Sequence, residues 1–227
     1  MSPTGGDCAA RSDGRLERGN AKRRAILDRA VDLASVSGLE TLSLGRLATE
    51  LGISKSGALL HFGSKLDLQL AVIGHAAERF VTAVVVPAEQ HPAGLERLRR
   101  LADGWLHHIE AGIFPGGCFF ATVGAEFGSR PGPVHDAIAE AHTQWIALLE
   151  KQATVAGDTG QLRAGVEPRQ LSFQLDAVIR HANLHRQLHD RPDAIADART
   201  AVVDFLSRAA TAESAKLLPS QGGAPLP

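Results

Sequence analysis

Cysteine is scarce in this chain, and long apolar runs are absent. The two cysteines, Cys8 and Cys118, form no obvious disulfide framework, so we expect a reducing compartment. No run of about 18 apolar residues occurs, and the first residues are polar and charged. A membrane span and a secretory signal are therefore not expected. These features predict a cytoplasmic protein that makes no membrane contact.

The motifs of two large enzyme classes are also missing. The sequence has neither a glycine loop that could cradle a nucleotide phosphate nor a serine elbow of the hydrolase type. Cys118 could act as a thiol nucleophile with His107 or His108, but this chemistry needs a low thiol pKa and a partnered histidine. Phe119 and Phe120 follow Cys118 and predict burial instead. A thiol enzyme is the least favoured alternative, and no cofactor is expected.

Charge is nearly balanced overall but unevenly distributed. The formal net charge of −1 would by itself argue against nucleic acid as a partner. Residues 1–65 carry ten Lys/Arg and seven Asp/Glu, a net charge of +3, whereas residues 66–227 carry fourteen and eighteen, a net charge of −4. A basic first part on an acidic body fits a DNA-binding end whose body is kept away from the phosphates.

Residues 41–65, TLSLGRLATELGISKSGALLHFGSK, have the pattern of a helix-turn-helix. Ser43 would cap a short helix with apolar residues at helical spacing, and Gly52 follows as the left-handed residue that ends it. Ser54 would cap a second helix of about two turns, which is too short to be stable alone. Held by the first helix, the second could enter a DNA major groove.

Together with its flanks, this segment resembles the DNA-binding domain of the tetracycline-repressor (TetR) family of bacterial regulators. The matching pieces are AILDRAVDLASVSGLETLSL, LATELGISKSGALLHFGSK and LDLQLAV. The resemblance implies an all-α fold with an N-terminal three-helix, helix-turn-helix DNA-binding domain and a C-terminal helical domain for ligand binding and dimerisation. We expect these domains at residues 21–67 and 68–212. A disordered basic tail at 1–20, which could touch DNA or stay solvated, and a flexible tail at 213–227 would flank them.

The candidate DNA contacts lie in the two short helices and directly after them: Ser43, Arg46, Lys55, Ser56, Gly57, Leu59, His61 and Lys65. Lys55 can donate to guanine O6 and N7, and His61 can donate to a phosphate. The resemblance implies backbone or groove-edge contacts for Ser43 and Arg46, and a phosphate contact for Lys65. It also places a tyrosine where this chain has Leu59, and the chain has no tyrosine at all. One contact is therefore lost, or replaced by apolar contact with a thymine methyl.

The expected body helices contain scattered aromatic residues that could enclose a ligand pocket. Its candidate lining residues are Trp105, His108, Ile109, Phe114, Cys118, Phe119, Val123, Phe127, Trp145, Phe173 and His181. Glu126 and Gln144 are further candidates for polar groups in such a pocket. The alternative is that these residues are simply core. A pocket of this composition favours a small, largely apolar effector over a sugar or a nucleotide.

Three histidines, His181, His185 and His189, follow one another at intervals of four residues. Two histidines one turn apart can bind zinc, but three span more than about 10 Å of helix axis. No cysteine or carboxylate cluster accompanies them. We therefore assign no metal site and expect these histidines at a subunit interface. A metal-responsive or an effector-independent regulator stays open as the alternative.

Dimerisation is the last expectation from the sequence. One short recognition helix reads too few base pairs, so a twofold dimer on a palindromic operator of double-stranded DNA is expected. The resemblance implies that the last two helices, near residues 169–189 and 192–212, form a four-helix bundle with their mates. The predicted function is a transcriptional regulator, of the repressor kind, that a small-molecule effector releases from DNA.

Overall fold

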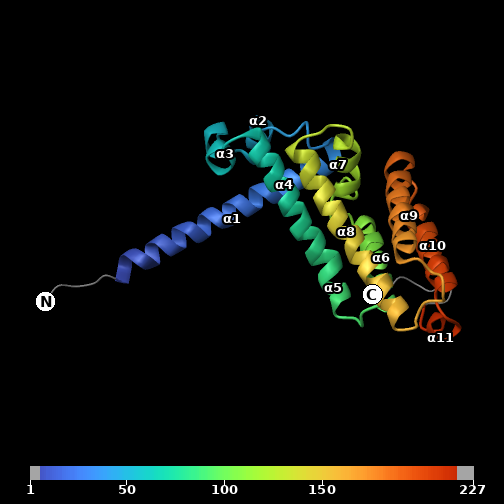
Figure 1. Ribbon diagram of the computed structural model, residues 1–227. Helices are drawn as coiled ribbons and strands as arrows, with labels where there is room; N and C mark the ends of the chain where they lie inside the picture. Colours follow the sequence, from blue (N-terminus) through green and yellow to red (C-terminus); the bar gives the residue numbers. More distant parts are fainter. Residues whose placement is uncertain (1–5, 219–227) are drawn as a thin grey trace.

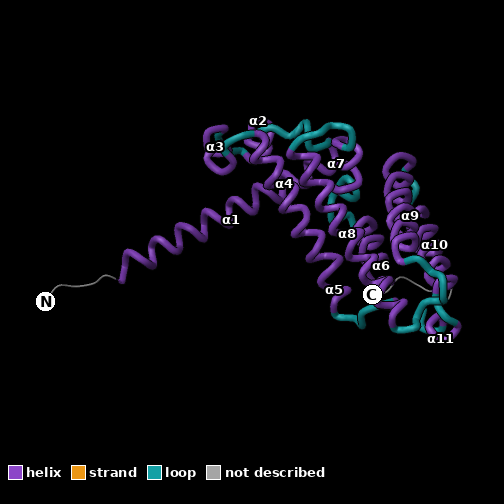
Figure 2. The backbone as a smooth tube through the Cα atoms, viewed as in Figure 1, coloured by secondary structure: helices purple, strands orange, loops and turns teal. Residues whose placement is uncertain are grey.

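The computed structural model describes the backbone of residues 6–218, and their side chains apart from those of residues 6–18, 55 and 58–60. Within this range the chain is helical, with one isolated β-bridge between Leu162 and Ala210 (Figures 1 and 2). The elements are α1 Gly6–Ser37, α2 Leu44–Leu51, α3 Lys55–Phe62, α4 Lys65–Phe80, η1 Val81–Val85, α5 Val86–Glu89, α6 Leu95–Glu110, α7 Phe119–Phe127, α8 Pro133–Asp158, α9 Pro168–His189, α10 Asp193–Ala209 and α11 Ala212–Ala215.

The C-terminal half of α1, α2 and α3 form what we call the head. Ser43 caps α2 by accepting a hydrogen bond from the Arg46 amide at 3.1 Å, and Gly52 ends it in the left-handed region with φ 63°. The Ser54 hydroxyl accepts from the Gly57 amide at 3.1 Å at the start of α3. These three features confirm the predicted helix-turn-helix boundaries, because each satisfies or reorients backbone groups that the helix ends leave free.

Helix α1 begins at Gly6, so the expectation of a disordered tail is wrong for residues 6–20. Two alanines, three arginines and a leucine in this part favour a helix, and extending an existing helix avoids the cost of nucleation. This part of α1 projects away from the rest of the molecule (Figure 1). The apolar face of the helix begins only at Ile26 and Leu27, which are buried in the head. Residues 1–5 of the expected tail lie outside the described residues.

The C-terminal segment also differs from the expected flexible tail at 213–227. Residues 212–215 form α11, and the side chains of Ser214 and Leu218 are buried against the body. The backbone of this segment is fixed because the Thr211 amide donates to the Gln161 carbonyl at 2.9 Å. Residues 219–227 of that expected tail lie outside the described residues.

A continuous helical rod, α4 followed by η1 and α5, connects the head to the body. Segment η1 is a π-helix, in which the Val86 amide bonds to the Val81 carbonyl five residues back. Val84 within it is buried, and Gly104 of α6 lets that helix approach: a Cβ on Gly104 would lie 3.4 Å from a Val84 methyl. An 18-residue stretch within residues 65–89 has a mean hydropathy of 1.4, enough to span a bilayer by length and composition, but core helices of soluble proteins also reach this value.

The body consists of α6 to α11, with two apolar clusters above one another along the rod. One cluster surrounds Trp105 and joins α6, α8, α9 and α10. The other joins the head to α7 and the start of α8: Phe119 and Val123 of α7 lie in the same cluster as Val31 and Leu47 of the head. The head is therefore not a separate globule, because it shares its hydrophobic core with α7.

Candidate DNA-binding surface and ligand cavity

Helices α2 and α3 lie at one end of the molecule, opposite α11 (Figure 1). Ser56 on α3 is exposed, and its hydroxyl lies 3.1 Å from that of Ser54. His61 is half-buried, with its ring 6.2 Å from that of Phe62. The side chains of Lys55 and Leu59 are outside the described set, so their contacts stay predictions. An exposed short helix of this kind can enter a major groove.

Arg46 and Lys65, two of the candidate DNA contacts, are engaged with the protein itself. Arg46 donates to the Thr41 hydroxyl at 2.9 Å. Lys65 Nζ donates to the Glu40 carboxylate at 2.7 Å and to the Glu40 carbonyl at 2.8 Å, and this contact lowers the pKa of the Glu40 carboxyl. Exposed pairs of this kind contribute about 1 kcal/mol or less, so a DNA phosphate can replace Glu40 at little cost.

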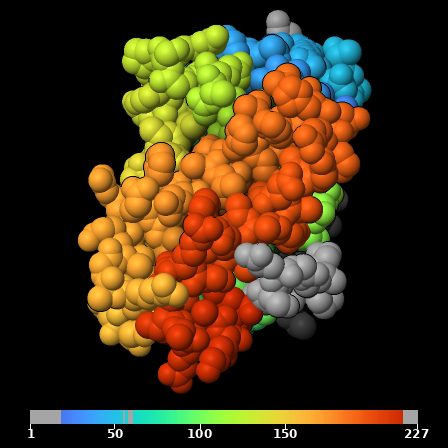
Figure 3. Space-filling model, turned by 90° about the vertical axis from the view of Figure 1, so that its right-hand side faces the viewer, coloured from blue at the N-terminus to red at the C-terminus, as the bar shows by residue number. Residues whose placement is uncertain are grey.

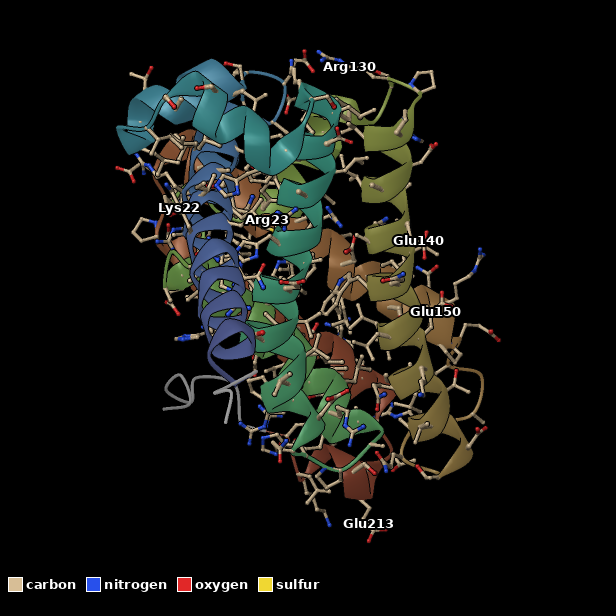
Figure 4. The ribbon with its side chains drawn as sticks, turned by 90° about the vertical axis from the view of Figure 1, so that its left-hand side faces the viewer. Lys22, Arg23, Arg130, Glu140, Glu150 and Glu213 are labelled. Atoms are coloured by element: carbon tan, nitrogen blue, oxygen red, sulfur yellow. The ribbon has the colours of Figure 1, made fainter. Side chains whose placement is uncertain are left out.

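Positive side chains follow the head, whereas acidic ones lie along the body. Figure 4 shows Arg130 at the same end as α2 and α3, with Lys22 and Arg23 on α1. Glu150 and Glu213 lie progressively farther toward the opposite end. Arg23 also lies over the Phe62 ring, with its Cζ 5.3 Å from the ring centroid. Among these labelled residues, the positive ones lie nearer to α3 than the acidic ones.

A cavity of about 170 Å³ lies in the body beside the connecting rod. Its walls come from α4, η1, α6, α7, α8 and α9, and its lining residues are Ala77, Phe80, Val81, Val85, Trp105, Cys118, Phe120, Ala141, His142, Gln144, Trp145, Leu148 and Arg180. The aromatic rings meet edge to face: the Trp145 centroid lies 5.2 Å from those of both Phe80 and Trp105. Such an apolar cavity with a few polar groups is suited to a small organic ligand.

Arg180 of α9 is the charged side chain among these lining residues. Its Cζ lies 5.5 Å from the Trp105 ring centroid, and its Nε donates to Asp176 Oδ2 at 2.8 Å. Asp176 also faces His142 Nε2 at 3.6 Å, and its pKa is lowered because hydrogen bonds to His142 and Arg180 outweigh its burial. Asp176 is therefore ionised, and its carboxylate fixes the guanidinium against the indole.

Cys118 lies at the inner wall and is inert as a nucleophile. It is 1% exposed, and burial raises the pKa of its thiol. Trp105 Nε1 donates to its sulfur at 3.4 Å, and no hydrogen bond joins Cys118 to a histidine among the described side chains. The thiolate chemistry that the sequence left open lacks both of its requirements here.

The loop that precedes α7, together with α7 itself, ties the cavity to the head. The Gly116 amide donates to the Ser35 hydroxyl of α1 at 3.1 Å, and the Cys118 amide donates to Asn183 Oδ1 of α9 at 2.9 Å. At the other end of α7, the Glu126 carboxylate accepts from the Leu39 amide at 2.7 Å and from the Glu40 amide at 3.0 Å. We call these contacts the head–body joint. They fix the position of the loop before α2 relative to α7.

Two family descriptions match the sequence. Residues 26–72 match the description "Bacterial regulatory proteins, tetR family", and residues 94–202 match "Tetracyclin repressor-like, C-terminal domain". The chain belongs to the TetR family of transcriptional regulators. It is a DNA-binding regulator and not an enzyme, and the two matches confirm the predicted order of a helix-turn-helix domain and a helical C-terminal domain.

Solved structures of TetR-family proteins share this fold. A regulator from Chloroflexus aurantiacus J-10-FL has a TM-score of 0.79 at 19% identity, over 86% of this chain and 98% of that one. One from Agrobacterium tumefaciens has a TM-score of 0.73 at 20% identity, over 85% and 99%. AibR, solved with isovaleryl coenzyme A and operator DNA, has a TM-score of 0.61 at 22% identity, over 75% and 88%. No curated protein matches the sequence.

The pocket residues expected from the sequence of this TetR-family protein fall into three groups. Trp105, Cys118 and Trp145 line the cavity, as does Gln144. Phe127 lines a neighbouring hollow of about 330 Å³ that shares Phe120, His142 and Arg180 with the cavity. The other buried candidates, which are not in the cavity wall, are His108, Ile109, Phe114, Phe119 and Val123. Most of these pack in the core between α7, the α6–α7 loop and the head, so the prediction that they line the pocket is wrong.

Phe173 and His181 are also misplaced by the sequence argument. Phe173 is 64% exposed, and His181 is exposed on the same outer face of α9. Leu175 and Ile179 form the inner face of that helix, because they are the buried residues one turn apart. An aromatic residue on an amphipathic helix looked like pocket lining because the sequence does not say which side of α9 faces the body.

Phe80, Phe120, His142 and Arg180 line the cavity but were not predicted. Phe80 belongs to α4, which was not among the helices expected to line a pocket, and Phe120 was considered only as evidence for burial of Cys118. One signal could have located Arg180: Asp176 precedes it by four residues on the same helix, a spacing at which an ion pair forms on one face.

The three spaced histidines of α9 stack along the helix. The ring centroids of His181 and His185 lie 4.4 Å apart, and those of His185 and His189 lie 5.1 Å apart. Among the side chains that the structure describes, no group of three or more His, Cys, Asp or Glu residues is placed to hold a metal ion.

Proposed function

We propose that this TetR-family protein is a homodimeric, cytoplasmic repressor that binds a palindromic operator and leaves it when a small, largely apolar effector binds. The observation that carries the proposal is the position of the cavity. Its walls include Phe80 and Val81 of the connecting rod and Phe120 of α7, and both elements contact the head. A ligand placed there contacts both the rod and α7, the two elements that join the body to the head.

The dimer interface that we propose is the outer face of α9 and α10, which Figure 3 views directly. An apolar stripe runs along α9: Phe173 is 64% exposed, Leu184 52% and Leu188 68%, with exposed Ala177 and His181 between them. Exposed apolar stripes of this length mark interaction surfaces. The inward faces of the same helices already pack within the subunit, so the outer faces are left for a second copy.

Small side chains on α10 favour this arrangement. Ala196 and Thr200 are exposed, and Val203 and Ser207 continue the same helical face. Large residues on α9 and small residues on α10 allow two copies to interdigitate in a four-helix bundle. Ala182, Ala194 and Ala198 are buried inside the subunit and support the α9–α10 contact instead.

A twofold dimer would fix the distance between the two copies of α3. Operator DNA binds when that distance matches two half-sites about one helical turn apart, or a multiple of it. An effector that prefers a different position of α7 or of the rod lowers the DNA affinity by the ratio of its affinities for the two states. AibR, bound to isovaleryl coenzyme A and operator DNA, supports the view that this fold can hold both kinds of partner.

A footprint of the purified protein on the DNA that flanks its own gene tests the proposal. We expect a protected inverted repeat whose affinity falls steeply between two salt concentrations, because phosphate contacts release counterions. A protected single half-site would contradict the dimer. Absence of protection at either salt, on any flanking fragment, would contradict an operator at this locus.

The assignment of α3 is tested by two alanine variants, Lys55→Ala and His61→Ala. Loss of a phosphate or base contact should weaken operator binding, and the loss of one phosphate contact should reduce the salt slope by about 1. Lys151→Ala is the matched control, because Lys151 is exposed on α8 and its removal changes the net charge equally. Unchanged DNA binding in both test variants would contradict the site, provided that all three proteins remain dimers.

A further inference from the structure

Two residues that line the cavity, Arg180 and Trp145, carry hydrogen-bond donors without a partner among the described residues. Arg180 uses its Nε for Asp176, and its two terminal nitrogens have no hydrogen-bond partner among the described residues. Trp145 is 9% exposed, and its indole Nε1 is buried without a partner. Gln144 is already used, because it donates to Glu140 at 2.7 Å. The buried indole N–H is costly unless a ligand accepts from it. The Arg180 side chain is 29% exposed, so its terminal nitrogens are free to exchange water for a ligand.

The guanidinium of Arg180 is also held in position before any ligand arrives. Asp176 binds its Nε edge, and the Trp105 ring lies against its face. The edge formed by the two terminal nitrogens is left, and this edge matches a planar carboxylate in bidentate geometry. Because the orientation is already fixed, little side-chain entropy is lost when the ligand binds.

We propose that the effector is a small aromatic or branched apolar acid whose carboxylate binds Arg180 while its apolar part occupies the ring-lined cavity. This inference rests on the proposed function of the cavity as the effector site. The volume of about 170 Å³ suits a single ring, since a cavity of about 150 Å³ is known to hold benzene. Edge-to-face contacts from Phe80, Trp105 and Trp145 suit an aromatic ring in particular.

The charges around Arg180 do not favour a cationic ligand. Asp176 is the nearest carboxylate, but Arg180 accounts for one of its oxygens, and it belongs to the neighbouring hollow and not to the cavity wall. Its second oxygen, Oδ1, is buried without a partner. A cation in the cavity would meet the guanidinium first. An anion meets a guanidinium and an indole N–H, and it leaves the Asp176 pair intact.

Tryptophan fluorescence can measure binding at this cavity directly. The chain has two tryptophans and no tyrosine, and both tryptophans line the cavity. Full-length protein is titrated with benzoate, phenylacetate and 3-phenylpropanoate, and with the neutral amide of each acid. We expect at least one acid to bind about tenfold or more tightly than its own amide, which corresponds to about 1.4 kcal/mol.

Two variants assign that preference to Arg180. Arg180→Gln should lose the preference for the acid while binding the amide within about twofold of wild type, and Arg180→Gln combined with Asp176→Asn guards against effects of an unpaired buried carboxylate. Arg208→Gln is the matched control, because Arg208 pairs with Asp204 at the same four-residue spacing on α10. Any of three results would overturn the inference. Acids and amides could bind wild type equally, no acid could bind, or the preference could survive in both Arg180 variants.

Operator release is measured separately, so that the two proposals can fail independently. An acid that binds in the fluorescence assay but does not release DNA would contradict the effector function and leave the ligand class standing. Release of DNA by a neutral apolar compound, with no acid binding, would contradict the ligand class and leave the effector function standing.

Discussion

Acid should destabilise this protein through one buried histidine, His108. The residue is 1% exposed, and neither ring nitrogen has a hydrogen-bond partner. Its ring packs edge to face against Phe114 at 4.6 Å and Phe80 at 5.4 Å. Burial in this apolar site, with the positive charge of Arg79 nearby, lowers the pKa of His108 from 6.5 to about 4. The native state therefore keeps His108 neutral over a range in which the unfolded chain binds a proton.

The sign and size follow from proton linkage. Between the two pKa values the unfolded state binds more protons, so the free energy of unfolding falls as the pH falls from about 7 toward 4. With a native pKa of about 4, His108 alone should remove about 2.5 kcal/mol of stability between pH 7.5 and pH 4.5. Above pH 7.5 both states are neutral at this residue, and the effect vanishes.

Urea unfolding of wild type and His108→Leu at pH 7.5, 5.5 and 4.5 measures this term. Carboxylates also titrate in this range, so the difference between the two proteins is the relevant quantity. His108→Leu should lose about 2.5 kcal/mol less than wild type over the pH interval, whereas His107→Leu, which alters the exposed neighbour, should follow wild type. Parallel loss of stability in wild type and His108→Leu would refute the reasoning.

Three further predictions concern the head–body joint and the dimer face. Gly116→Ala should lower the unfolding free energy by about 2 kcal/mol or more, since its Cβ would lie 2.0 Å from the Ser35 carbonyl oxygen, whereas Gly157→Ala, with nothing within 4 Å, should not; thermal denaturation compares them. Glu126→Gln should speed hydrogen exchange at the Leu39 and Glu40 amides, and Glu140→Gln should leave that exchange unchanged. Equal protection in wild type and both variants would rule out a role of the Glu126 carboxylate in the head–body joint. Phe173→Glu with Leu188→Glu should yield monomers in light scattering, whereas Leu217→Glu, at a residue 78% exposed outside α9, should remain dimeric.

Local signals were sufficient to predict the helix-turn-helix from the sequence. Ser43, Gly52 and Ser54 act at the helix ends through their own backbone neighbours, so their roles can be read without knowing the rest of the fold. The same holds for burial of Cys118, which its two following phenylalanines indicated. Boundaries failed where no local signal exists: the start of α1 depends on helix propagation, and the packing of α11 depends on contacts with a distant loop.

The cavity could be predicted only in part, because its wall is assembled from five separate helices and η1. Trp105 and Trp145 stood out by size and rarity. Phe119 and Val123 looked equivalent to them in the sequence, yet they pack against the head. Helical spacing distinguishes an apolar face from a polar one, but it does not say whether the apolar face meets a cavity, another domain or a second subunit. Phe173 is exposed, and we propose the last case for it.

The π-helical turn in the connecting rod has a geometric consequence. A π turn holds one more residue than an α turn, and Pro87, two residues after the end of η1, has no amide with which to restore the regular ladder. Conversion of this turn to α geometry would advance the chain by one residue, which rotates everything on its head side by about 100° and shifts it by about 1.5 Å along the axis. Val81 and Val85, the first and last residues of the turn, both line the cavity. The rod therefore contains one extra residue at the point where it forms part of the cavity wall.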